Sequence, residues 1–572
     1  MVSDRIVLCG GFPSPVLAKG QKVVTLGIGG GANNVNLRVS DIGLRTAVNI
    51  PDVMIDLIEI AAYVYSADQA TTRGGEGVLD VGAKWRRNFQ FLIPVRQPSV
   101  WSHRDVDEVL RSTLGFLSED TYTFTFRPLS NPTPMEQYLE GTVERREIDQ
   151  VLLFSGGLDS LGGAVQEAVT NKRRVALVSH RSTPKVDRPQ QDLANDLASY
   201  CPDNPPLHVP VWANKEKALG IEATQRTRCF LYASLGVAVA RMLGLTGLRF
   251  YENGITSFNL PISEQLVGAR ASRTTHPQAL NGFAKLFGLL LQEEFRLENP
   301  FIWNTKAEVV NLIGAAGCGD LIKHTVSCIH TLDRTKLHTH CGLCSQCVGR
   351  RLATLASDFG NADPMEMYKV DLLTGSRNDG PDLTLLESLI RTAREMESMS
   401  DRQFFSKFGE ASRVINHLPG KASEVGTQIL DLHRRYGAEV GHVLTKGMSE
   451  HASDIREGRL PQTCAIALAV HDKYRNRSAS DVPEDGSNLE PESGNGRKHL
   501  SKKDQHLLEV VGVQLFRTLT NAEIIRRKSM IRSFDPNADT EAVRARLNRI
   551  RKHQHFPSSA SLRKESVNPK AG

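Results

Sequence analysis

The segment 153–160, Leu-Phe-Ser-Gly-Gly-Leu-Asp-Ser, constrains the fold of this chain more than any other feature. The apolar run 151–154 predicts a buried strand, and a Ser-Gly-Gly-x-Asp-Ser loop follows it directly. Small residues between a buried strand and a helix let backbone N–H groups surround phosphate oxygens, with the positive end of the helix dipole behind them. A sharp turn that needs glycine for its backbone angles is the alternative, but it requires neither the serines nor the aspartate. We therefore expect a nucleotide pyrophosphate site at Ser155, Gly156, Gly157, Leu158, Asp159 and Ser160.

Strands and helices alternate after this loop. The apolar runs 175–178, 207–211 and 248–251 predict further buried strands, and residues 190–200 predict a helix. Residues 229–243 are apolar nearly all round, which predicts a core helix behind the sheet. Alternation of this kind implies a parallel sheet that binds its ligands at the carboxyl ends of the strands. The fold class that follows is α/β, with a Rossmann-like parallel sheet in a domain at residues 146–360.

Polar residues at the predicted strand ends are candidates for the site. Ser179 and His180 end the second strand, and we assign them to the nucleotide site. Arginine side chains bind carboxylates and phosphates bidentately, which suits a substrate that carries either group. The candidates for substrate binding are Arg226, Arg228, Glu252, Asn253, Gly254, Thr275 and His276. Taken alone, each of these candidates is explained equally well as an exposed loop residue.

Four of the nine cysteines have the spacing of metal ligands. Cys341, Cys344 and Cys347 recur every third residue, and Cys328 lies thirteen residues upstream of them. Four thiolates in this pattern form a tetrahedral shell that suits a structural zinc ion and leaves no open position for water. An iron–sulfur cluster and unrelated buried cysteines are the alternatives, and His338 and His340 are competing ligands. The other cysteines have no partner at such a spacing.

The flanking regions differ in character from this domain. Residues 1–145 predict a β-rich domain, with strands at 23–26, 61–65, 89–95 and 121–126 and one helix at 106–117. Residues 361–475 predict a helical region, in which positions 429, 432, 436 and 440 share one helix face. A polar stretch at 476–497 predicts a flexible linker, and residues 498–572 predict a small basic helical domain.

Charge separates the tail from the rest of the chain. Residues 497–572 carry 17 Lys and Arg against 7 Asp and Glu, whereas residues 1–496 carry 53 against 57. Such a tail can meet nucleic acid through an Arg-rich third helix, dock on an acidic partner protein, or keep the chain soluble. No apolar run reaches the roughly eighteen residues of a membrane span, and no basic leader precedes an apolar block. We therefore expect a soluble, cytoplasmic protein that contacts no membrane.

The loop at 155–160 resembles the pyrophosphate loop of the N-type ATP pyrophosphatases, the PP-loop superfamily. Together with the four cysteines, which Arg350 and Arg351 follow, it resembles the 7-cyano-7-deazaguanine synthase (QueC) family over residues 148–360. The resemblance implies a Rossmann-like sheet that binds ATP and Mg²⁺ beside a zinc knuckle. It also implies adenylation of 7-carboxy-7-deazaguanine, attack by ammonia to give an amide, and dehydration to the nitrile with a second ATP.

Carried over to this chain, the resemblance assigns roles to the candidate residues. The loop residues 155–160 would hold the phosphates, with Asp159 and Ser160 closest to the chemistry and Asp159 helping to place Mg²⁺. A carboxylate is a poor electrophile until its oxygen becomes a leaving group, so the metal and the backbone donors would offset the charge of the departing pyrophosphate. Glu252 would accept hydrogen bonds from the amino face of a guanine-like base.

The chain is longer than the housekeeping enzymes of that family at both ends. The segments 63–68 and 85–87 look like the extra amino-terminal domain of QueC-like proteins from bacterial anti-phage defence operons, including the QatC proteins of the Qat system. A protein of this kind would act as an ATP-dependent carbon–nitrogen ligase that delivers the activated acid to an amine other than ammonia, for example on a partner protein from the same operon. The alternatives are a nitrile-forming (preQ0) synthase for tRNA or DNA modification and a scaffold subunit that binds ATP without consuming it.

Overall fold

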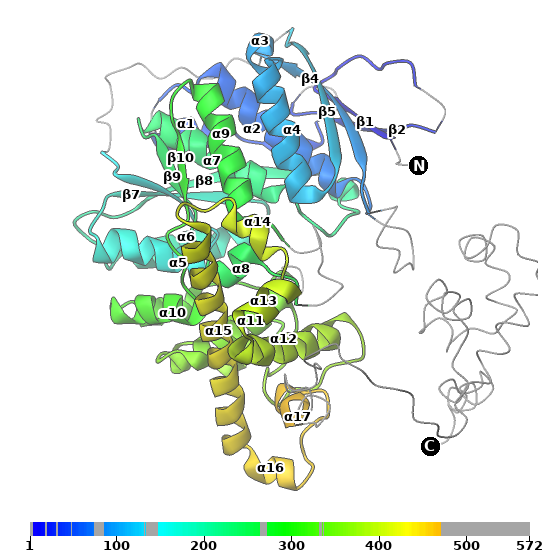
Figure 1. The fold of residues 1–572 in the computed structure, drawn as a ribbon. Helices are drawn as coiled ribbons and strands as arrows, with labels where there is room; N and C mark the ends of the chain where they lie inside the picture. The colour runs from blue at the N-terminus through cyan, green and yellow to red at the C-terminus, as the bar shows by residue number, and fades with distance from the viewer. Residues whose placement is uncertain are drawn as a thin grey trace, which may run out of the picture. The chain divides into compact units, whose positions relative to one another are not determined.

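A computed structural model gives the fold of the chain (Figure 1). It describes residues 4–17, 20–29, 33–46, 48–73, 85–130, 132, 147–262, 272–330, 334–335 and 337–470. Contacts divide the chain into two units, residues 1–481 and 482–572, and every described residue belongs to the first. The linker expected at 476–497 and the helices expected within 498–572 lie outside the described residues. The domain boundaries expected near residues 145 and 360 stay predictions.

The loop at 155–160 follows the central strand of a six-stranded sheet whose order is β10-β9-β6-β7-β8-β3. Five strands are parallel, and β3 pairs with β8 in the antiparallel direction. Strand β6 lies between β7 and β9, so the strand order reverses there, and ligands bind at such a switch point in open α/β sheets. The predicted Rossmann-like parallel sheet is confirmed, with strands β3 Val35–Leu37, β6 Gln150–Leu153, β7 Val175–Arg181, β8 Leu207–Lys215, β9 Gly247–Arg249 and β10 Arg296–Glu298.

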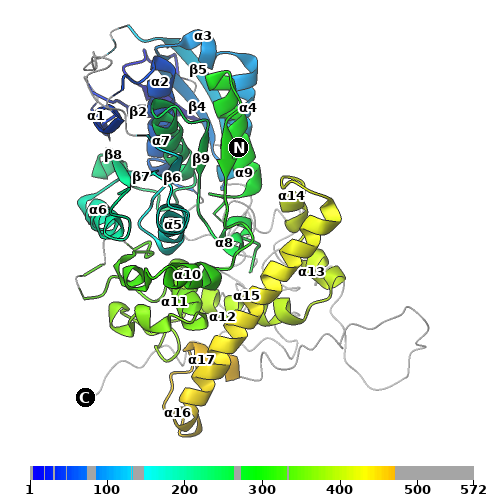
Figure 2. The ribbon, with the colours of Figure 1, turned by 90° about the vertical axis from the view of Figure 1, so that its left-hand side faces the viewer.

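Helices cover both faces of this sheet (Figure 2). The helix α5, Leu158–Ala164, follows the loop and continues as a π-helical turn, Val165–Thr170. Gly163 lets α5 lie close to the next strand end, because a Cβ atom there would stand 2.1 Å from the ring of Tyr251. The predicted core helix is α7, which is buried on nearly all sides. The helices around the sheet are α6 Pro184–Ala198, α7 Arg228–Met242, α8 Gly254–Phe258, α9 Pro277–Leu291 and α10 Lys306–Ala315.

The amino-terminal region contains a second sheet with the order β2-β1-β4-β5, in which every pairing is parallel. The strands predicted at 23–26, 89–95 and 121–126 and the helix predicted at 106–117 are confirmed. The elements here are β1 Asp4–Cys9, β2 Lys22–Leu26, β4 Asn88–Val95, β5 Thr121–Pro128, α1 Ser40–Thr46, α2 Asp52–Gln69, α3 Pro98–Trp101 and α4 Arg104–Ser118.

The strand predicted at 61–65 is wrong, because these residues lie in the middle of α2. Their β-branched and aromatic side chains favour a strand, but no Gly or Pro interrupts the 18 residues of the helix. Helix α2 is buried on almost every side and packs against α7, so its sequence shows no polar face. A short apolar run of this kind does not distinguish a buried strand from a buried helix.

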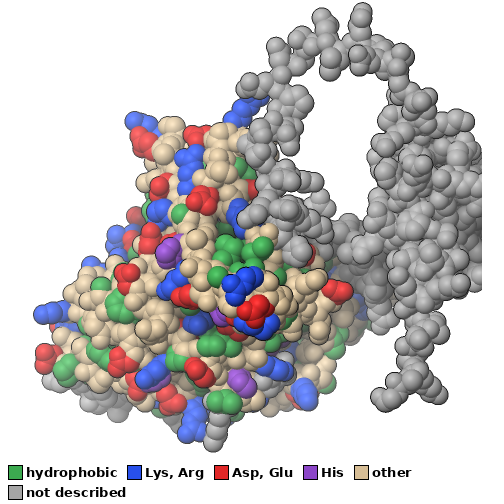
Figure 3. Space-filling model, turned by 90° about the horizontal axis from the view of Figure 1, so that it is seen from below, with side chains coloured by type: hydrophobic (Ala, Val, Ile, Leu, Met, Phe, Trp, Pro, Cys, Tyr) green, Lys and Arg blue, Asp and Glu red, His purple; other side chains and the backbone are tan. Residues whose placement is uncertain are grey.

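A helical region follows the sheet, as predicted. Its long helix α15 carries Ile429, Leu432, Tyr436 and Val440 on one face, where they pack against other helices of the region. None of the helices that the structure describes is long and apolar enough to cross a membrane. Acidic and basic side chains are interspersed on the face that Figure 3 shows. The helices here are α11 Ser345–Ala356, α12 Pro381–Ser398, α13 Asp401–Lys407, α14 Ala411–Ile415, α15 Ala422–Glu450, α16 Ala452–Arg456 and α17 Ala465–Val470.

Candidate functional site

The loop after β6 has the conformation that its sequence predicts. Gly156 adopts a φ of +80°, a region that side chains with a Cβ rarely enter. The Ser155 hydroxyl accepts a hydrogen bond from the Gly157 N–H at 3.3 Å and lies 3.1 Å from the Ser160 hydroxyl. The side chain of Gln190 in α6 donates to the Ser155 carbonyl at 3.0 Å, which fixes the loop from the next crossover. The N–H groups at the start of α5 have no acceptor within the helix and are free to bind an anion.

A cavity of about 1140 Å³ extends from this loop along the carboxyl ends of the strands. Ligand pockets usually measure roughly 300–1,000 Å³, so this one has room for more than a nucleotide. Its walls come from distant parts of the chain, since α2, α7, α11, α12 and α15 each contribute. Residues that line it are Tyr65, Ser155, Gly156, Gly157, Leu158, Asp159, Ser160, Gln190, Arg226, Arg228, Glu252, Asn253, Thr275, Lys306, Cys328, Cys344, Ser345, Asp382, His433, Tyr436 and Glu439.

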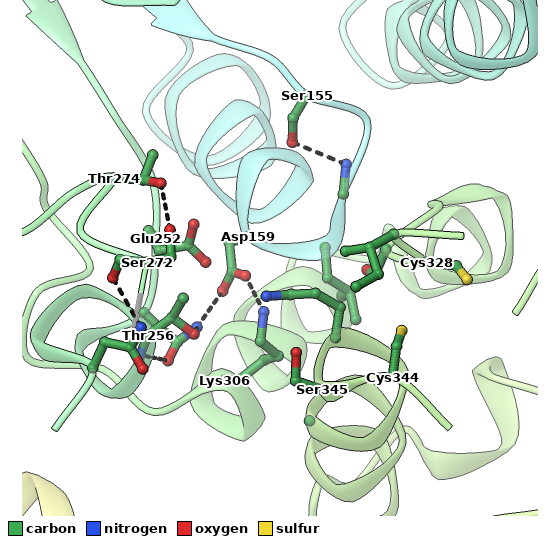
Figure 4. A pocket seen from close by; sticks show the side chains of 18 of the residues that line it. Ser155, Asp159, Glu252, Thr256, Ser272, Thr274, Lys306, Cys328, Cys344 and Ser345 are labelled. Atoms are coloured by element: carbon green, nitrogen blue, oxygen red, sulfur yellow. Dashed lines mark hydrogen bonds and ion pairs between the residues drawn. The ribbon is translucent and has the colours of Figure 1, made fainter. Parts of the chain in front are cut away.

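Asp159 is the centre of a charged cluster in this cavity (Figure 4). Its carboxylate forms an ion pair with Lys306, the first residue of α10, and accepts a hydrogen bond from the Asn253 amide at 3.2 Å. Asn253 in turn caps α8, because its side chain accepts from the Thr256 N–H at 3.1 Å. Glu252 lies beside Asp159 at the end of β9.

Burial and mutual repulsion determine the ionisation of this cluster. Burial raises the pKa of Glu252 to about 8, and the neighbouring Asp159 carboxylate adds to that rise. Burial alone would lower the pKa of Lys306, but the charges of Asp159 and Glu252 outweigh it and raise that pKa. Two carboxyl groups therefore share one ammonium group.

Oxygen ligands of this kind suit Mg²⁺, which binds proteins through one or two carboxylates together with substrate phosphates. Asp159 and Glu252 supply such carboxylates in and beside the loop at 155–160. A cation there would keep Glu252 ionised, since the positive charge offsets the repulsion from Asp159. The donor set thus fits the Mg²⁺ that the sequence analysis expects.

Two residues assigned to the nucleotide site do not line the cavity. Ser179 and His180 lie inside β7, which extends to Arg181, and both are fully buried. The Ser179 hydroxyl donates to the Phe154 carbonyl at 2.7 Å, and a His180 ring nitrogen lies 2.6 Å from the Ala213 carbonyl. Burial, with the nearby charge of Arg228, lowers the pKa of His180 to about 3. The sequence placed the end of this strand too early, so two sheet residues were assigned to the site.

The predicted substrate residues divide into two groups. Arg226, Arg228, Glu252, Asn253 and Thr275 line the cavity, whereas Gly254 and His276 do not. Gly254 instead allows a close approach, since a Cβ atom there would stand 2.1 Å from the Ile302 carbonyl oxygen. His276 caps α9 by accepting from the Gln278 N–H at 3.1 Å, and its ring packs against Phe116.

A buried ion-pair cluster of the amino-terminal region holds the segment that carries the two arginines. Asp68 at the end of α2 accepts hydrogen bonds from the N–H and the hydroxyl of Thr227, both at 3.1 Å. The same carboxylate pairs with Arg73 at 3.0 Å and with Arg87 at 2.5 Å, and both arginines also pair with Asp120. Thr227 lies between Arg226 and Arg228, so this cluster fixes their backbone.

The four cysteines meet as the sequence predicts. The sulfur atoms of Cys328, Cys341, Cys344 and Cys347 lie within 4.8 Å of one another, a group that could bind zinc. The Cys341 sulfur accepts from the N–H groups of Leu343 at 3.4 Å and Cys344 at 3.3 Å, and such bonds favour a thiolate. The group does not include His340, which stacks on Tyr368 and whose pKa burial lowers to about 3, nor His338.

The cysteine group borders the cavity without pointing into its centre. Cys328 and Cys344 line the cavity, and their sulfur atoms turn away from Asp159 (Figure 4). Arg350 on α11 supports this wall from behind: it is fully buried, pairs with Asp363 at 2.8 Å and donates to the Tyr368 hydroxyl at 3.1 Å. The arrangement indicates a structural role for the four cysteines in the cavity wall, separate from the charged cluster at Asp159.

Sequence reasoning missed several residues of the cavity. Lys306 had a signal, because Thr305 and Glu308 form the capping box of the helix that starts at Lys306. Tyr65 was missed because its segment was interpreted as a strand. Glu439 had no local signal, since its position depends on how α15 packs against α11 and α12.

Comparison with known proteins gives one family match. Residues 272–357 match the family model described as queuosine biosynthesis protein QueC. No curated protein matches the chain. The matched segment contains Thr275, Lys306 and all four cysteines, whereas the loop at 155–160 precedes it. This part of the chain is therefore QueC-like, and a QueC-like domain indicates an ATP-using enzyme that activates carboxylates.

Proposed function

We propose that this protein uses ATP to adenylate a carboxylate similar to 7-carboxy-7-deazaguanine and then joins the activated acid to an amine. One observation carries the proposal: Asp159 of the phosphate loop pairs with Lys306 of the QueC-like segment, inside a cavity at the switch point of the sheet. Two parts of the chain that separately suggest ATP chemistry thus meet in one ion pair.

In the first step, a carboxylate oxygen of the acid attacks the α-phosphorus of ATP and pyrophosphate leaves. Residues 155–160 would hold the β- and γ-phosphates through backbone N–H groups and the two serine hydroxyls. Lys306 would offset the negative charge that develops on the departing pyrophosphate. Asp159 and Glu252 would hold Mg²⁺, which supplies Lewis acidity at the phosphates.

The remaining cavity residues suit recognition of the acid. Arg226 and Arg228 offer guanidinium groups to its carboxylate, and Asn253 and Thr275 offer hydrogen bonds to a planar heterocycle. Burial lowers the pKa of Arg226 to about 10, with a contribution from the charge of Arg73, so this side chain is still cationic at neutral pH. We infer that the arginines orient the carboxylate toward the phosphate loop.

The regions outside the QueC-like segment favour an amine other than ammonia. The amino-terminal region contributes Tyr65 to the cavity, and the helical region contributes Asp382, Tyr436 and Glu439. These additions, with the resemblance to QatC-type proteins, support a carbon–nitrogen ligase of anti-phage defence that modifies an amine on a partner protein. A preQ0 synthase for tRNA or DNA modification has the same first step and would differ in its product.

Product analysis tests the proposal. We expect incubation with 7-carboxy-7-deazaguanine and Mg–ATP to release pyrophosphate, and mass spectrometry to detect an amide with the amine of an operon partner. A nitrile formed with ammonia alone would instead support the preQ0 synthase. Absence of pyrophosphate release with any acid, together with an Asp159→Ala variant that keeps full biological function, would indicate a scaffold subunit and contradict both enzymes.

The basic region 498–572 supports a separate role in partner binding. Its charge favours nucleic acid or an acidic protein surface, and the interspersed charges that Figure 3 shows on one face of the described chain provide no comparable basic surface there. We infer that deletion of residues 498–572 lowers nucleic-acid affinity and its dependence on salt concentration, as measured by fluorescence anisotropy. An unchanged, salt-insensitive affinity would contradict a nucleic-acid role.

A further inference from the structure

Helix α15 of the carboxy-terminal helical region forms part of the cavity wall. His433, Tyr436, Glu439 and Val440 line the cavity, and they occupy consecutive turns of one face of this helix. The QueC-like match ends at residue 357, so α15 lies outside it. A helix that borders the cavity from outside the matched segment is a natural place for a function specific to this chain.

Two contacts attach α15 to the first turn of α10. The Glu439 carboxylate accepts a hydrogen bond from the Thr305 hydroxyl at 2.5 Å. One turn earlier on α15, Arg435 forms an ion pair with Glu308 and donates to the Trp303 carbonyl at 2.9 Å. Thr305 precedes Lys306, so Glu439 is attached directly to the turn that carries the partner of Asp159.

The Thr305 hydrogen bond involves only one oxygen of the Glu439 carboxyl group. The Thr305 hydroxyl oxygen already accepts from the Glu308 N–H at 3.3 Å, so its own proton points to Glu439. Glu439 is the acceptor in this bond, and its second oxygen makes no contact with Thr305. The side chain is only partly buried and lines the cavity, which leaves a carboxylate oxygen available for a proton.

We propose that Glu439 is the general base of the second step and accepts the proton of the attacking amine. This inference rests on the proposed function. The amine nitrogen forms a bond to the acyl carbon of the adenylate, the bond from that carbon to the AMP oxygen breaks, and its electron pair leaves with AMP. The proton that the nitrogen loses goes to the Glu439 carboxylate, so the products are an amide, AMP and a protonated Glu439.

The ionisation of Glu439 suits this role. Burial raises the pKa of Glu439 to about 7, and the charge of Glu308 adds to the rise, whereas the Thr305 hydrogen bond and Arg435 oppose it. A general base works best when its pKa lies near the working pH. The neighbouring His433 does not compete, because burial lowers its pKa to about 4.

The test separates the two half-reactions. A Glu439→Gln variant keeps the size of the side chain and an oxygen that accepts from Thr305, but it cannot take a proton. We expect ATP–pyrophosphate exchange with the acid to change less than about twofold, and amide formation from adenylate and amine to slow about 100-fold, as for loss of a general base. A Glu439→Asp variant should recover part of the rate. Hydroxylamine, which is largely unprotonated at neutral pH, should replace the amine and rescue the second half-reaction in Glu439→Gln, with a hydroxamate and AMP as the products.

Glu424→Gln is the matched control, because it makes the same substitution at an exposed position of the same helix, outside the cavity. It should leave both half-reactions at the wild-type rate. Equal slowing of exchange and amide formation in Glu439→Gln, equal effects of the two substitutions, or no rescue by hydroxylamine would overturn the inference. Wild-type protein that shows no exchange with any acid would overturn the proposed function, and the inference with it.

Discussion

The Lys306 ammonium group donates to the Asp159 carboxylate, and this contact joins the first turn of α5 to the first turn of α10. The two residues belong to helices that follow different strands of the sheet, β6 and β10. Because the carboxyl ends of parallel strands meet at one edge, residues 147 positions apart form one charged site. The pair therefore connects the loop at 155–160 to the segment that matches QueC.

Removal of this ammonium group should impair the first half-reaction. In a Lys306→Met variant, the ammonium group no longer offsets part of the charge on the departing pyrophosphate, and the Asp159 and Glu252 carboxylates repel each other more strongly. We expect ATP–pyrophosphate exchange to fall about 100-fold or more, in the range seen when one transition-state donor is lost. Lys323→Met, at an exposed position outside the cavity, is the control, and equal exchange rates in the two variants would contradict a role for Lys306.

Glu252 should make the stability of the ligand-free protein fall as the pH rises. Its pKa in the folded protein is about 8, above the value of about 4.3 in an unfolded chain. Between these values the folded state binds more protons, so the free energy of unfolding decreases with rising pH. A Glu252→Gln variant lacks this titration. The difference between its Tm and the Tm of the wild type should therefore shift in favour of the variant by several degrees from pH 5 to pH 8.

Mg–ATP provides a second measurement on the same residue. If Asp159 and Glu252 hold the metal, saturating Mg–ATP should raise the Tm of the wild type at pH 8 and raise that of Glu252→Gln much less. Glu424→Gln, an exposed substitution on α15, controls for the loss of one charge. Equal stabilisation of all three proteins would contradict metal binding at Glu252.

The four cysteines should bind one zinc ion that stabilises the cavity wall. Elemental analysis by mass spectrometry should find about one zinc per chain, and a Cys347→Ser variant should lose it. We expect the Tm to fall by at least about 5 °C, because metal-binding energy contributes to folding. Cys201→Ala, at a buried cysteine outside the group, should keep its zinc. A wild-type protein that contains iron instead would indicate a cluster.

The buried pair behind this wall should contribute more to stability than an exposed pair. Asp363 and Arg350 are both fully buried, so Asp363→Asn leaves an uncompensated arginine and should lower the free energy of unfolding by about 3–5 kcal/mol. Asp149→Asn breaks the exposed pair with Arg174 and should cost less than about 1 kcal/mol. Chemical denaturation measures both, and similar losses would contradict the assigned burial.

The sequence predicts the features that are encoded locally. The loop at 155–160 is recognisable because Gly156 needs a positive φ and because a buried strand and a helix border it. The cysteine group is recognisable because three of its members lie within seven residues of one another in the sequence. The parallel sheet follows from the alternation of strands and helices, and the structure confirms each predicted strand from β6 to β9.

The features that the sequence does not reveal depend on tertiary packing. Strand β7 continues through Ser179 and His180 because β8 pairs with it to Trp212, and this pairing removes both side chains from the cavity. Helix α2 packs against α7 and is buried on almost every side, so its sequence lacks the polar face that marks most helices. For that reason residues 61–65 were predicted to form a strand. Glu439 reaches the cavity because α15 packs against α11 and α12, and Arg435 adds an ion pair to α10.

The ion-pair cluster at Asp68 should couple the amino-terminal region to substrate binding. Burial opposes ionisation of Asp68, but the charges of Arg87 and Arg73 outweigh burial and lower its pKa. An Asp68→Asn variant removes the carboxylate charge that pairs with Arg73 and Arg87. It also weakens the two hydrogen bonds from Thr227. Because Arg226 and Arg228 flank Thr227, we expect the KM for the acid to rise about tenfold while the KM for ATP changes little.

Stability measurements test the same variant independently. The lowered pKa of Asp68 gives the wild type a stabilisation that is present above the pKa of an unfolded aspartate, about 3.9, and is lost as the pH falls through the folded value. Asp68→Asn should therefore be less stable than wild type at pH 7, with a difference that shrinks toward acidic pH. Asp105→Asn, at an exposed site on α4, should match wild type in KM and stability. If the Asp68→Asn protein is less stable but its KM for the acid is unchanged, the cluster contributes to folding and not to substrate binding.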